Sequence, residues 1–307
     1  MDILVFGGAG FIGKHLCSRL AFLGHRVRVF NRPSLSGNWP DIAGVEWLPG
    51  DFTNPEETAS VLDGAEVVFH LVSTTLPKSS NDSPVVDLKD NVVSTLHLLD
   101  SVVKMKKRPK IVFISSGGTI YGIPRQIPIP EIHPIDPICA YGVGKLSIEK
   151  YLSLYRYLHG LEYRILRIAN PYGENQSVFS GQGAISVFLK KALQEETIEI
   201  WGDGSVIRDY IYIDDAIDSL IKIINYDGCE RIFNIGSGQG YSLNNLVKMI
   251  EQLLGKHVDR RYLPSRQFDV PVNVLDIALA QNELEWSPKT SLYDGLQKML
   301  THMKNLS

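Results

Sequence analysis

The sequence has little cysteine and no long hydrophobic run. Its 307 residues include three widely spaced cysteines, Cys17, Cys139 and Cys229, with no C-x-x-C pattern, so neither a disulfide framework nor a metal site is predicted. The longest apolar runs, such as 66–71 and 110–114, fall far short of the roughly 18 residues that cross a bilayer. The first residues already fit a strand and show no signal-peptide pattern, so we expect a cytoplasmic protein without a membrane partner.

The chain also lacks a strong net charge. Its formal charge of -3 and its pI near 6.2 create no global field for polyanions. One basic cluster, 104–108, lies where a helix is expected to end, and cations there complement the helix dipole. No aromatic or repeat pattern accompanies the cluster, so we expect no nucleic-acid partner.

The first half of the chain alternates strand-like and helix-like segments. We predict strands at 3–6, 26–30, 45–48, 66–71, 110–115 and 163–168, and helices at 10–23, 55–62, 86–107 and 141–158. Strands that alternate with crossover helices are typical of a parallel sheet covered on both faces. The predicted fold class is therefore α/β, a Rossmann-type doubly wound parallel sheet, with ligands at the carboxyl ends of its strands.

After residue 168 the pattern loosens and glycine and proline become more frequent. Helices are predicted at 184–195, 214–225 and 242–254, and short strands at 198–200 and 207–212. We expect residues 1–168 to form the Rossmann domain, with 208–241 packing back onto it, and 169–307 to form a smaller C-terminal α/β substrate lobe. No repeat, low-complexity segment or flexible linker is evident.

A glycine-rich segment follows the first predicted strand and opens the first helix. Gly7, Gly10 and Gly13 permit a tight turn and let a dinucleotide pyrophosphate approach the N–H groups of the helix, near Phe11 and Ile12. Two further strand ends fit the same ligand. Asp51 and Phe52 are candidates for the adenine, and Leu71, Val72 and Ser73 form a shelf of small residues.

The end of the second strand leaves the choice of dinucleotide open. NAD enzymes usually carry an acidic residue there for the ribose, whereas this chain has Asn31 followed by Arg32. The Asn31 amide can still bind a diol. The Arg32 guanidinium also makes a 2′-phosphate tolerable, so NAD is favoured and NADP stays open.

A tyrosine and a lysine four residues apart start the helix predicted at 141–158. Tyr141 and Lys145 lie on one helical face, so we expect the ammonium to lower the pKa of the phenol. Tyr141 then acts as a general acid or base. Together with the glycine loop, the pair points to hydride chemistry on a hydroxyl or ketone.

These motifs resemble the extended short-chain dehydrogenase/reductase family and, within it, the nucleotide-sugar 4-epimerases. The resemblance covers nearly the whole chain. It is carried by the glycine loop, Gly50-Asp51, His70-Leu71, Asn91 in 90–95, residues 115–122, Tyr141-x-x-x-Lys145, 167–173, 201–204, 208–210, 234–236, Arg266 and Asp269.

The resemblance implies an isomerase that inverts C4 of a UDP-hexose through a transient 4-keto sugar and an NAD that stays bound. By the same resemblance, Lys145 binds the nicotinamide ribose and Tyr141 exchanges a proton with the 4-hydroxyl. Asn91, Ser115 and Pro171 complete the cofactor set. The resemblance also implies a homodimer through the helices predicted at 86–107 and 141–158.

One position departs from the family pattern. The family usually has Ser or Thr where this chain has Gly117, and Ser116 and Thr119 are the nearby candidates to replace that hydroxyl. The Asp-Glu pair of the family's 4,6-dehydratases is absent, because Gly118 and Thr119 stand in its place, so a dehydratase is not expected.

The sugar-nucleotide contacts are expected mainly in the second lobe. Arginine suits phosphate oxygens. The remaining candidate substrate residues are Thr75, Ser116, Gly117, Tyr141, Asn170, Gln182, Phe188, Arg208, Arg266, Asp269 and Asn273, the last aligned with the position that influences sugar choice. Two other functions stay open: an NADPH-dependent nucleotide-sugar 4-ketoreductase, and a non-catalytic dinucleotide sensor.

Overall fold

The computed structural model describes residues 1–33, 39–75, 77–176, 183–265 and 270–306. The chain divides into two compact units. The first contains residues 1–120, 137–167 and 220–233, and the second contains residues 121–136, 168–219 and 234–307. The domain bounds expected from the sequence, with a change at residue 168, stay a prediction.

A seven-stranded sheet organises the first unit. Its strands are β1 (Asp2–Phe6), β2 (Arg26–Asn31), β3 (Val45–Pro49), β4 (Val67–His70), β5 (Lys110–Ser116), β6 (Tyr163–Ile168) and β10 (Ile232–Ile235). They lie in the order β10-β6-β5-β4-β1-β2-β3. The β1 strand pairs in parallel with both β2 and β4, so the strand order reverses there, as in a doubly wound sheet. The predicted fold class is confirmed.

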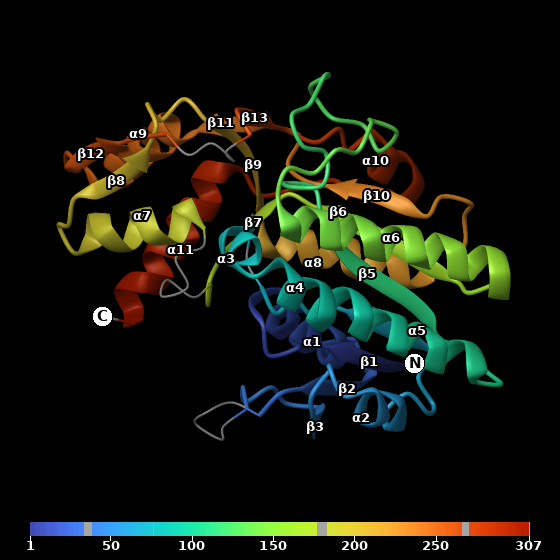
Figure 1. Cartoon of the computed structure of the whole chain (residues 1–307). Helices are drawn as coiled ribbons and strands as arrows, with labels where there is room; N and C mark the ends of the chain where they lie inside the picture. The colour runs from blue at the N-terminus through green and yellow to red at the C-terminus, as the bar shows by residue number, and fades with distance from the viewer. Residues whose placement is uncertain (34–38, 76, 177–182, 266–269, 307) are drawn as a thin grey trace. The chain divides into compact units, whose positions relative to one another are not determined.

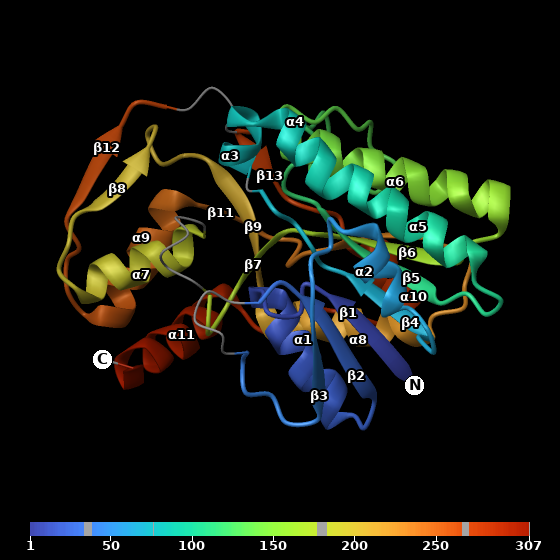
Figure 2. The same ribbon diagram turned by 60° about the horizontal axis from the view of Figure 1, so that its bottom comes forward.

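Helices cover both faces of this sheet. They are α1 (Phe11–Phe22), α2 (Pro55–Ser60), α3 (Pro77–Asp82), α4 (Pro84–Asp87), a π-helix (Leu88–Val93), α5 (Ser94–Lys104) and α6 (Ala140–His159). Figures 1 and 2 show α2, α5 and α6 on one face and α1 on the other. Local chemistry fixes some ends: the Asn54 side chain caps α2, and α6 ends at Gly160, whose left-handed φ of 68° suits glycine.

The prediction of one continuous helix at 86–107 is wrong in its continuity and in its end point. The segment is divided into α4, the π-helix and α5, and it ends at Lys104. Hydrophobic periodicity cannot detect such a division, because a wider turn displaces the apolar positions by only one residue. The π-helix carries Asn91, one of the predicted cofactor residues.

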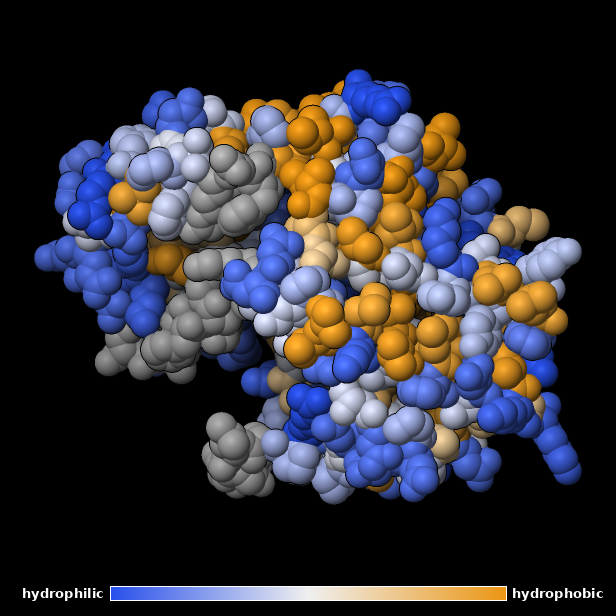
Figure 3. Space-filling view, in the orientation of Figure 1, coloured by the Kyte–Doolittle hydropathy of each residue, from blue (hydrophilic) through white to orange (hydrophobic). Residues whose placement is uncertain are grey.

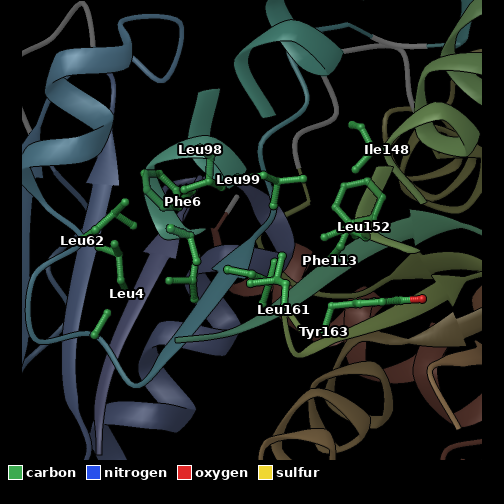
Figure 4. Packing of buried hydrophobic residues seen from close by; sticks show 14 of the residues in the cluster. Leu4, Phe6, Leu62, Leu98, Leu99, Phe113, Ile148, Leu152, Leu161 and Tyr163 are labelled. Carbon is green, nitrogen blue, oxygen red and sulfur yellow. The ribbon is translucent and has the colours of Figure 1, made fainter. Parts of the chain in front are cut away.

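The hydrophobic core of the first unit lies between the sheet and its helices. Figure 4 shows Leu4 and Phe6 of β1, Leu98 and Leu99 of α5, and Phe113 of β5 within one cluster. These five residues are fully buried. Burial of apolar surface contributes about 25 cal/mol per Å² to the free energy of folding. The cluster therefore holds the strands, and with them their carboxyl ends, in place.

The second unit contains short strands and amphipathic helices. Its elements are β7 (Asn170–Tyr172), α7 (Ala184–Leu193), β8 (Ile198–Trp201), β9 (Ile207–Tyr212), β11 (Gly240–Ser242), α9 (Leu243–Leu254), β12 (Arg260–Leu263), β13 (Val272–Asn273), α10 (Ala278–Leu284) and α11 (Leu292–Leu306). Helix α8 (Ile213–Lys222) and a 3-10 turn (Ile223–Asn225) precede β10. The strands β7, β11, β12 and β13 were not predicted, because two to four residues carry too little periodic signal.

Strand β9 organises this unit. It pairs with β7, β11 and β13, and its Asp209 is fully buried. The Asp209 carboxylate accepts hydrogen bonds from the backbone N–H groups of Ser237, Gly238 and Leu275. In the part of the chain that the structure describes, no helix is long and apolar enough to span a membrane.

Candidate active site

A groove at the carboxyl ends of the strands of the first unit carries the predicted dinucleotide residues. Its volume is about 270 Å³. It is lined by Gly7, Gly10, Phe30, Asn31, Arg32, Phe52, Leu71, Val72, Ser73 and Thr74. Eight of these ten were predicted from sequence. Phe30 and Thr74 were missed, although each directly adjoins a predicted residue at a strand end.

The backbone at the start of α1 is shaped for close approach. Gly7 adopts a φ of 86°, and a Cβ there would lie 3.1 Å from the backbone nitrogen of Val72. Gly10 caps α1 without a side-chain hydrogen bond. The free N–H groups and the positive end of the dipole therefore face an open groove, the arrangement that binds a pyrophosphate. Phe11 and Ile12 begin the helix, as predicted.

We predict that Gly13→Ala destroys this loop. A Cβ at Gly13 would lie 2.5 Å from the carbonyl oxygen of Gly7 and 2.6 Å from the Cα of Gly8, both backbone atoms that cannot rotate away. Dinucleotide affinity should fall at least tenfold, as measured by fluorescence titration. The control is Ala21→Gly, which changes a residue of the same helix, α1. Gly24→Ala is unsuitable as a control, because the positive φ of Gly24 would make an alanine there strained. Unchanged affinity in Gly13→Ala would contradict this account.

The residues at the end of β2 are tied to their neighbours. The Asn31 side chain accepts a hydrogen bond from the Ala9 N–H and donates one to the Arg32 carbonyl. Arg32 forms an ion pair with Asp51, 2.9 Å between Nη2 and Oδ1. Thr53 donates its N–H and its hydroxyl to the same Asp51 oxygen. The two charges at this end of the groove are therefore paired.

Tyr141 lies in the first turn of α6, with its hydroxyl toward the groove. Its N–H donates to the Ser80 hydroxyl, and Ala140 N–H donates to Asn81, so α3 satisfies the N-terminal groups of α6. Burial raises the pKa of Tyr141 to about 12, against the lowering effect of a hydrogen bond with the Ser73 side chain. Ser73 lines the groove. The phenol thus reaches the same shelf as the predicted dinucleotide.

Lys145 is buried one turn further along α6. Its Nζ donates to the Ile114 carbonyl at 2.9 Å and lies 4.7 Å from the centroid of the Phe113 ring. Burial lowers the pKa of Lys145 to about 8, and the charges of Asp87 and Glu149 oppose that shift.

The expected effect of Lys145 on the Tyr141 pKa is corrected by this geometry. The ammonium lies 5.6 Å from the centroid of the Tyr141 ring, and it donates to a carbonyl rather than to the phenol oxygen. Desolvation therefore dominates, and the pKa of the phenol is raised, not lowered.

Asn91 connects the π-helix to the groove. Its side-chain oxygen accepts the Thr74 N–H at 3.0 Å, and its carbonyl accepts the Thr95 hydroxyl at 2.6 Å. Because the Thr95 hydroxyl gives its single proton to Asn91, it accepts the Nε2 proton of His70 at 2.8 Å. Burial, with the Lys145 charge second, lowers the pKa of His70 to about 3, so the imidazole is neutral. Asn91 therefore supports the loop rather than projecting into the groove.

Three hydroxyl-bearing residues, Ser115, Ser116 and Thr119, lie within two positions of Gly117 in the sequence at the end of β5. Ser115 is 3% exposed, Ser116 is half-buried, and the Ser116 carbonyl accepts the Ile120 N–H. The Ser115 and Thr119 hydroxyls are buried and have no hydrogen-bond partner among the described residues. Buried hydroxyls normally have partners. Both are therefore candidates to receive a ligand oxygen.

Three predicted substrate residues of the second unit, Asn170, Arg208 and Asn273, lie on β9 or on strands that pair with it. Asn170 donates its side-chain N–H to the Asp209 carbonyl, and Arg208 donates to the carbonyls of Ile207 and Val270. Asn273 of β13 is opposite Arg208 and is 1% exposed. Phe188 of α7 is buried. Pro171 of β7, which was predicted for the cofactor, is half-buried. Gln182, Arg266 and Asp269 lie outside the described residues.

A second groove, of about 780 Å³, lies within the second unit. It is lined by Trp201, Gly202, Asp203, Ser205, Val206, Tyr262, Leu263, Ser265 and Pro271. The loop 201–204 was a predicted motif, but Tyr262 and Leu263 were missed. Parallel pairing of β12 with β8 brings Leu263 opposite Trp201, a contact that sequence spacing does not signal.

Comparison with known proteins agrees with this arrangement. The sequence pattern of the NAD dependent epimerase/dehydratase family matches residues 3–236. The UDP-glucose 4-epimerase of Mycolicibacterium smegmatis is 32% identical, with 100% of each chain covered. The dTDP-4-dehydro-6-deoxyglucose reductase of Escherichia coli is 31% identical over 98% of this chain and 97% of that protein.

Solved structures agree in fold over the whole length. The crystal structure of UDP-glucose 4-epimerase with UDP-glucose from Thermotoga maritima has a TM-score of 0.94 and 34% identity, and covers 100% of this chain and 99% of that one. The family pattern matches most of the chain, and relatives above 30% identity cover its full length. Together these matches establish the family. The chain belongs to the NAD dependent epimerase/dehydratase family.

Proposed function

We propose that this protein is a nucleotide-sugar 4-epimerase that inverts C4 of a UDP-hexose with an NAD that stays bound. The observation that carries the proposal is the placement of the Tyr141 hydroxyl at Ser73, on the wall of the glycine-lined groove. A general acid or base at that point adjoins the site of hydride transfer. The likeness to UDP-glucose 4-epimerases over the full length supports the substrate class.

In this proposal each residue has a separate role. A bound NAD would supply the acceptor and the donor of a hydride at C4. The N–H groups at the start of α1 bind the pyrophosphate, and Asn31 binds the adenosine ribose. Tyr141 takes the proton of the 4-hydroxyl and gives it back, while the Lys145 ammonium binds the nicotinamide ribose. Thr119, whose buried hydroxyl has no partner in the described chain, replaces the hydroxyl missing at Gly117.

The decisive experiment uses purified protein and no added cofactor. A panel of UDP-sugars is incubated with the protein, and the ratio of C4 epimers is measured by NMR. An epimerase brings one UDP-sugar to an equilibrium mixture from either direction. If bound NAD is present but no sugar changes at C4, the proposal is refuted.

A ketoreductase is the second candidate, because a full-length relative is named a reductase and the Arg32 guanidinium at the groove makes a 2′-phosphate tolerable. The pairing of Arg32 with Asp51 argues against it, since the carboxylate neutralises the guanidinium and repels a phosphate. A reductase would consume added NADPH in proportion to a 4-keto sugar.

We predict that Asp51→Asn shifts the dinucleotide preference toward NADP. The variant keeps the shape of the side chain but removes the charge that pairs with Arg32. Two charges about 4 Å apart in water interact by about 1 kcal/mol, so the ratio of NADP to NAD affinity should rise about fivefold. Asp41→Asn is the control for charge alone. An unchanged ratio in Asp51→Asn would remove Arg32 and Asp51 from the choice of cofactor.

We further propose that the protein is a homodimer through α4, α5 and α6. Figure 3 shows hydrophobic residues gathered over these helices. The exposed fractions are 63% for Val85, 51% for Val86, 48% for Val143, 43% for Leu154 and 86% for Tyr157. A second copy of the same face covers such a patch by two-fold symmetry.

We predict that Leu154→Asp converts the dimer to a monomer. The substitution places a charge within the apolar face, and its desolvation opposes association. Light scattering coupled to size exclusion measures the mass. Ile132→Asp, at an isoleucine 93% exposed outside these helices, is the control. A monomeric wild-type protein would contradict the proposed assembly.

The cytoplasmic location and the lack of a nucleic-acid partner stay predictions.

A further inference from the structure

A buried carboxylate lies beside the candidate catalytic pair, and none of the roles above uses it. Asp87 is the last residue of α4, immediately before the π-helix, and is 3% exposed. A carboxylate is rarely buried to this degree unless its oxygens are hydrogen-bonded.

The Asp87 carboxylate holds the loop that follows β4. Its Oδ1 accepts the hydroxyl of Thr75 and, at 3.1 Å, the side-chain N–H of Asn91. The same Asn91 N–H group lies 3.1 Å from the Asp87 carbonyl and 3.4 Å from the Thr75 hydroxyl. Since Asn91 also binds the Thr74 N–H, residues 74 and 75 are fixed from two sides. This loop includes Ser73, the partner of Tyr141.

The other oxygen of Asp87 lies against α6. A Cβ added to Gly144 would stand 3.0 Å from Oδ2, so a side chain at this position would require the carboxylate to move by a few tenths of an ångström. Gly144 lies between Tyr141 and Lys145 in the sequence of α6. The carboxylate therefore adjoins the helical turn that carries both catalytic candidates.

We propose that Asp87 is a positioning residue for the epimerisation: its carboxylate fixes the Ser73–Thr75 loop through Thr75 and Asn91 and places a negative charge beside the first turns of α6. This inference rests on the proposed function. The charge favours the ammonium of Lys145, which burial alone disfavours, and fixing the loop keeps Ser73 beside the Tyr141 hydroxyl.

The charges around these groups can be assigned individually. Lys145 is influenced by Asp87 from α4 and by Glu149 from its own helix, and its charge in turn acts on His70 of β4. Tyr141 is influenced by Asp87 and by Cys139, which precedes α6. Asp87 raises the pKa of both Tyr141 and Lys145, so removal of its charge lowers both.

The test is a pair of titrations on Asp87→Asn. In protein with ¹⁵N-labelled lysine, the Nζ resonance of Lys145, identified by its loss in Lys145→Met, reports deprotonation of the ammonium. We expect its midpoint to fall by about one pH unit from a wild-type value near the pKa of about 8. Because Lys145 is charged only below its pKa, the alkaline limb of kcat/KM should move to lower pH by the same amount.

Asp90→Asn is the matched control, since it removes a carboxylate from the same π-helix and Asp90 is not among the charges that act on Lys145 or Tyr141. Its two midpoints should equal those of the wild type. A merely structural role of Asp87 would lower the maximum of kcat/KM and leave both midpoints in place, and that result would overturn the proposal.

Thr75→Val tests the same network without changing charge. The variant removes the Thr75 hydroxyl that donates to the Asp87 carboxylate. We therefore expect kcat to fall about tenfold and the midpoint of the Lys145 titration to stay unchanged. A wild-type kcat would refute the positioning role even if Asp87→Asn failed to fold. The NMR titration needs no substrate, so a wild-type protein that inverts no sugar would count against the proposed function and not against the effect of Asp87 on Lys145.

Discussion

Replacing Tyr141 by phenylalanine should lower kcat by about 10²- to 10⁴-fold, the usual contribution of a positioned acid or base. The variant removes one oxygen, leaves the ring between α6 and its neighbours, and leaves intact the N–H that donates to Ser80. NAD content and thermal midpoint should therefore stay near the wild-type values. The initial rate of C4 inversion is the quantity to measure.

Tyr157→Phe provides the matched control for this variant. Tyr157 lies in the same helix and is 86% exposed, so the identical loss of a hydroxyl there should not change the rate. A Tyr141→Phe protein with more than about a tenth of wild-type kcat would contradict the acid and base role.

Replacing Arg167 by leucine should destabilise the protein by about 3 to 5 kcal/mol. Arg167 of β6 and Glu149 of α6 form a two-point pair, 3.1 Å between Nε and Oε1 and 2.7 Å between Nη2 and Oε2. Both side chains are almost completely buried, at 2% and 3% exposed. The variant leaves the Glu149 carboxylate in the core without this guanidinium, and the loss appears as a lower urea midpoint.

The double variant Arg167→Leu with Glu149→Leu should recover part of that stability, because it removes the stranded carboxylate together with its partner. Arg26→Leu is the control for an exposed pair. Arg26 is 65% exposed and pairs with Asp2 and Glu46, so its loss should cost at most about 1 kcal/mol. Equal effects at Arg26 and Arg167 would show that burial does not decide the strength of this ion pair.

Eight of the residues that the local sequence predicted for the cofactor lie around one groove. Glycine spacing, strand ends and the Tyr141/Lys145 pair depend on neighbours within a few residues, and the structure gathers the glycine loop, Asn31, Phe52 and Ser73 around one groove. The second unit was predicted less well. Its groove depends on pairing between β8 and β12, which are about sixty residues apart, and no local pattern encodes that pairing.

Electrostatics was where reasoning from the sequence went wrong. A spacing of i and i+4 places Lys145 near Tyr141, but it does not show that the ammonium instead donates to the Ile114 carbonyl. The same spacing contains no information about burial, which raises the pKa of the phenol. A pKa depends on all groups around the side chain, most of them distant in sequence.

The sequence alone determined the α/β class, the doubly wound sheet, the glycine-rich loop and the placement of Tyr141 and Lys145 on one helix, because each follows from periodicity or from short spacing along one element. The tertiary structure alone decided the division of the helix before Lys104, the pairing of Arg32 with Asp51, and the burial of Asp87 beside α6. These features arise where separate segments meet. The free energy of such contacts depends on distance and desolvation in the folded chain, which the order of residues does not specify.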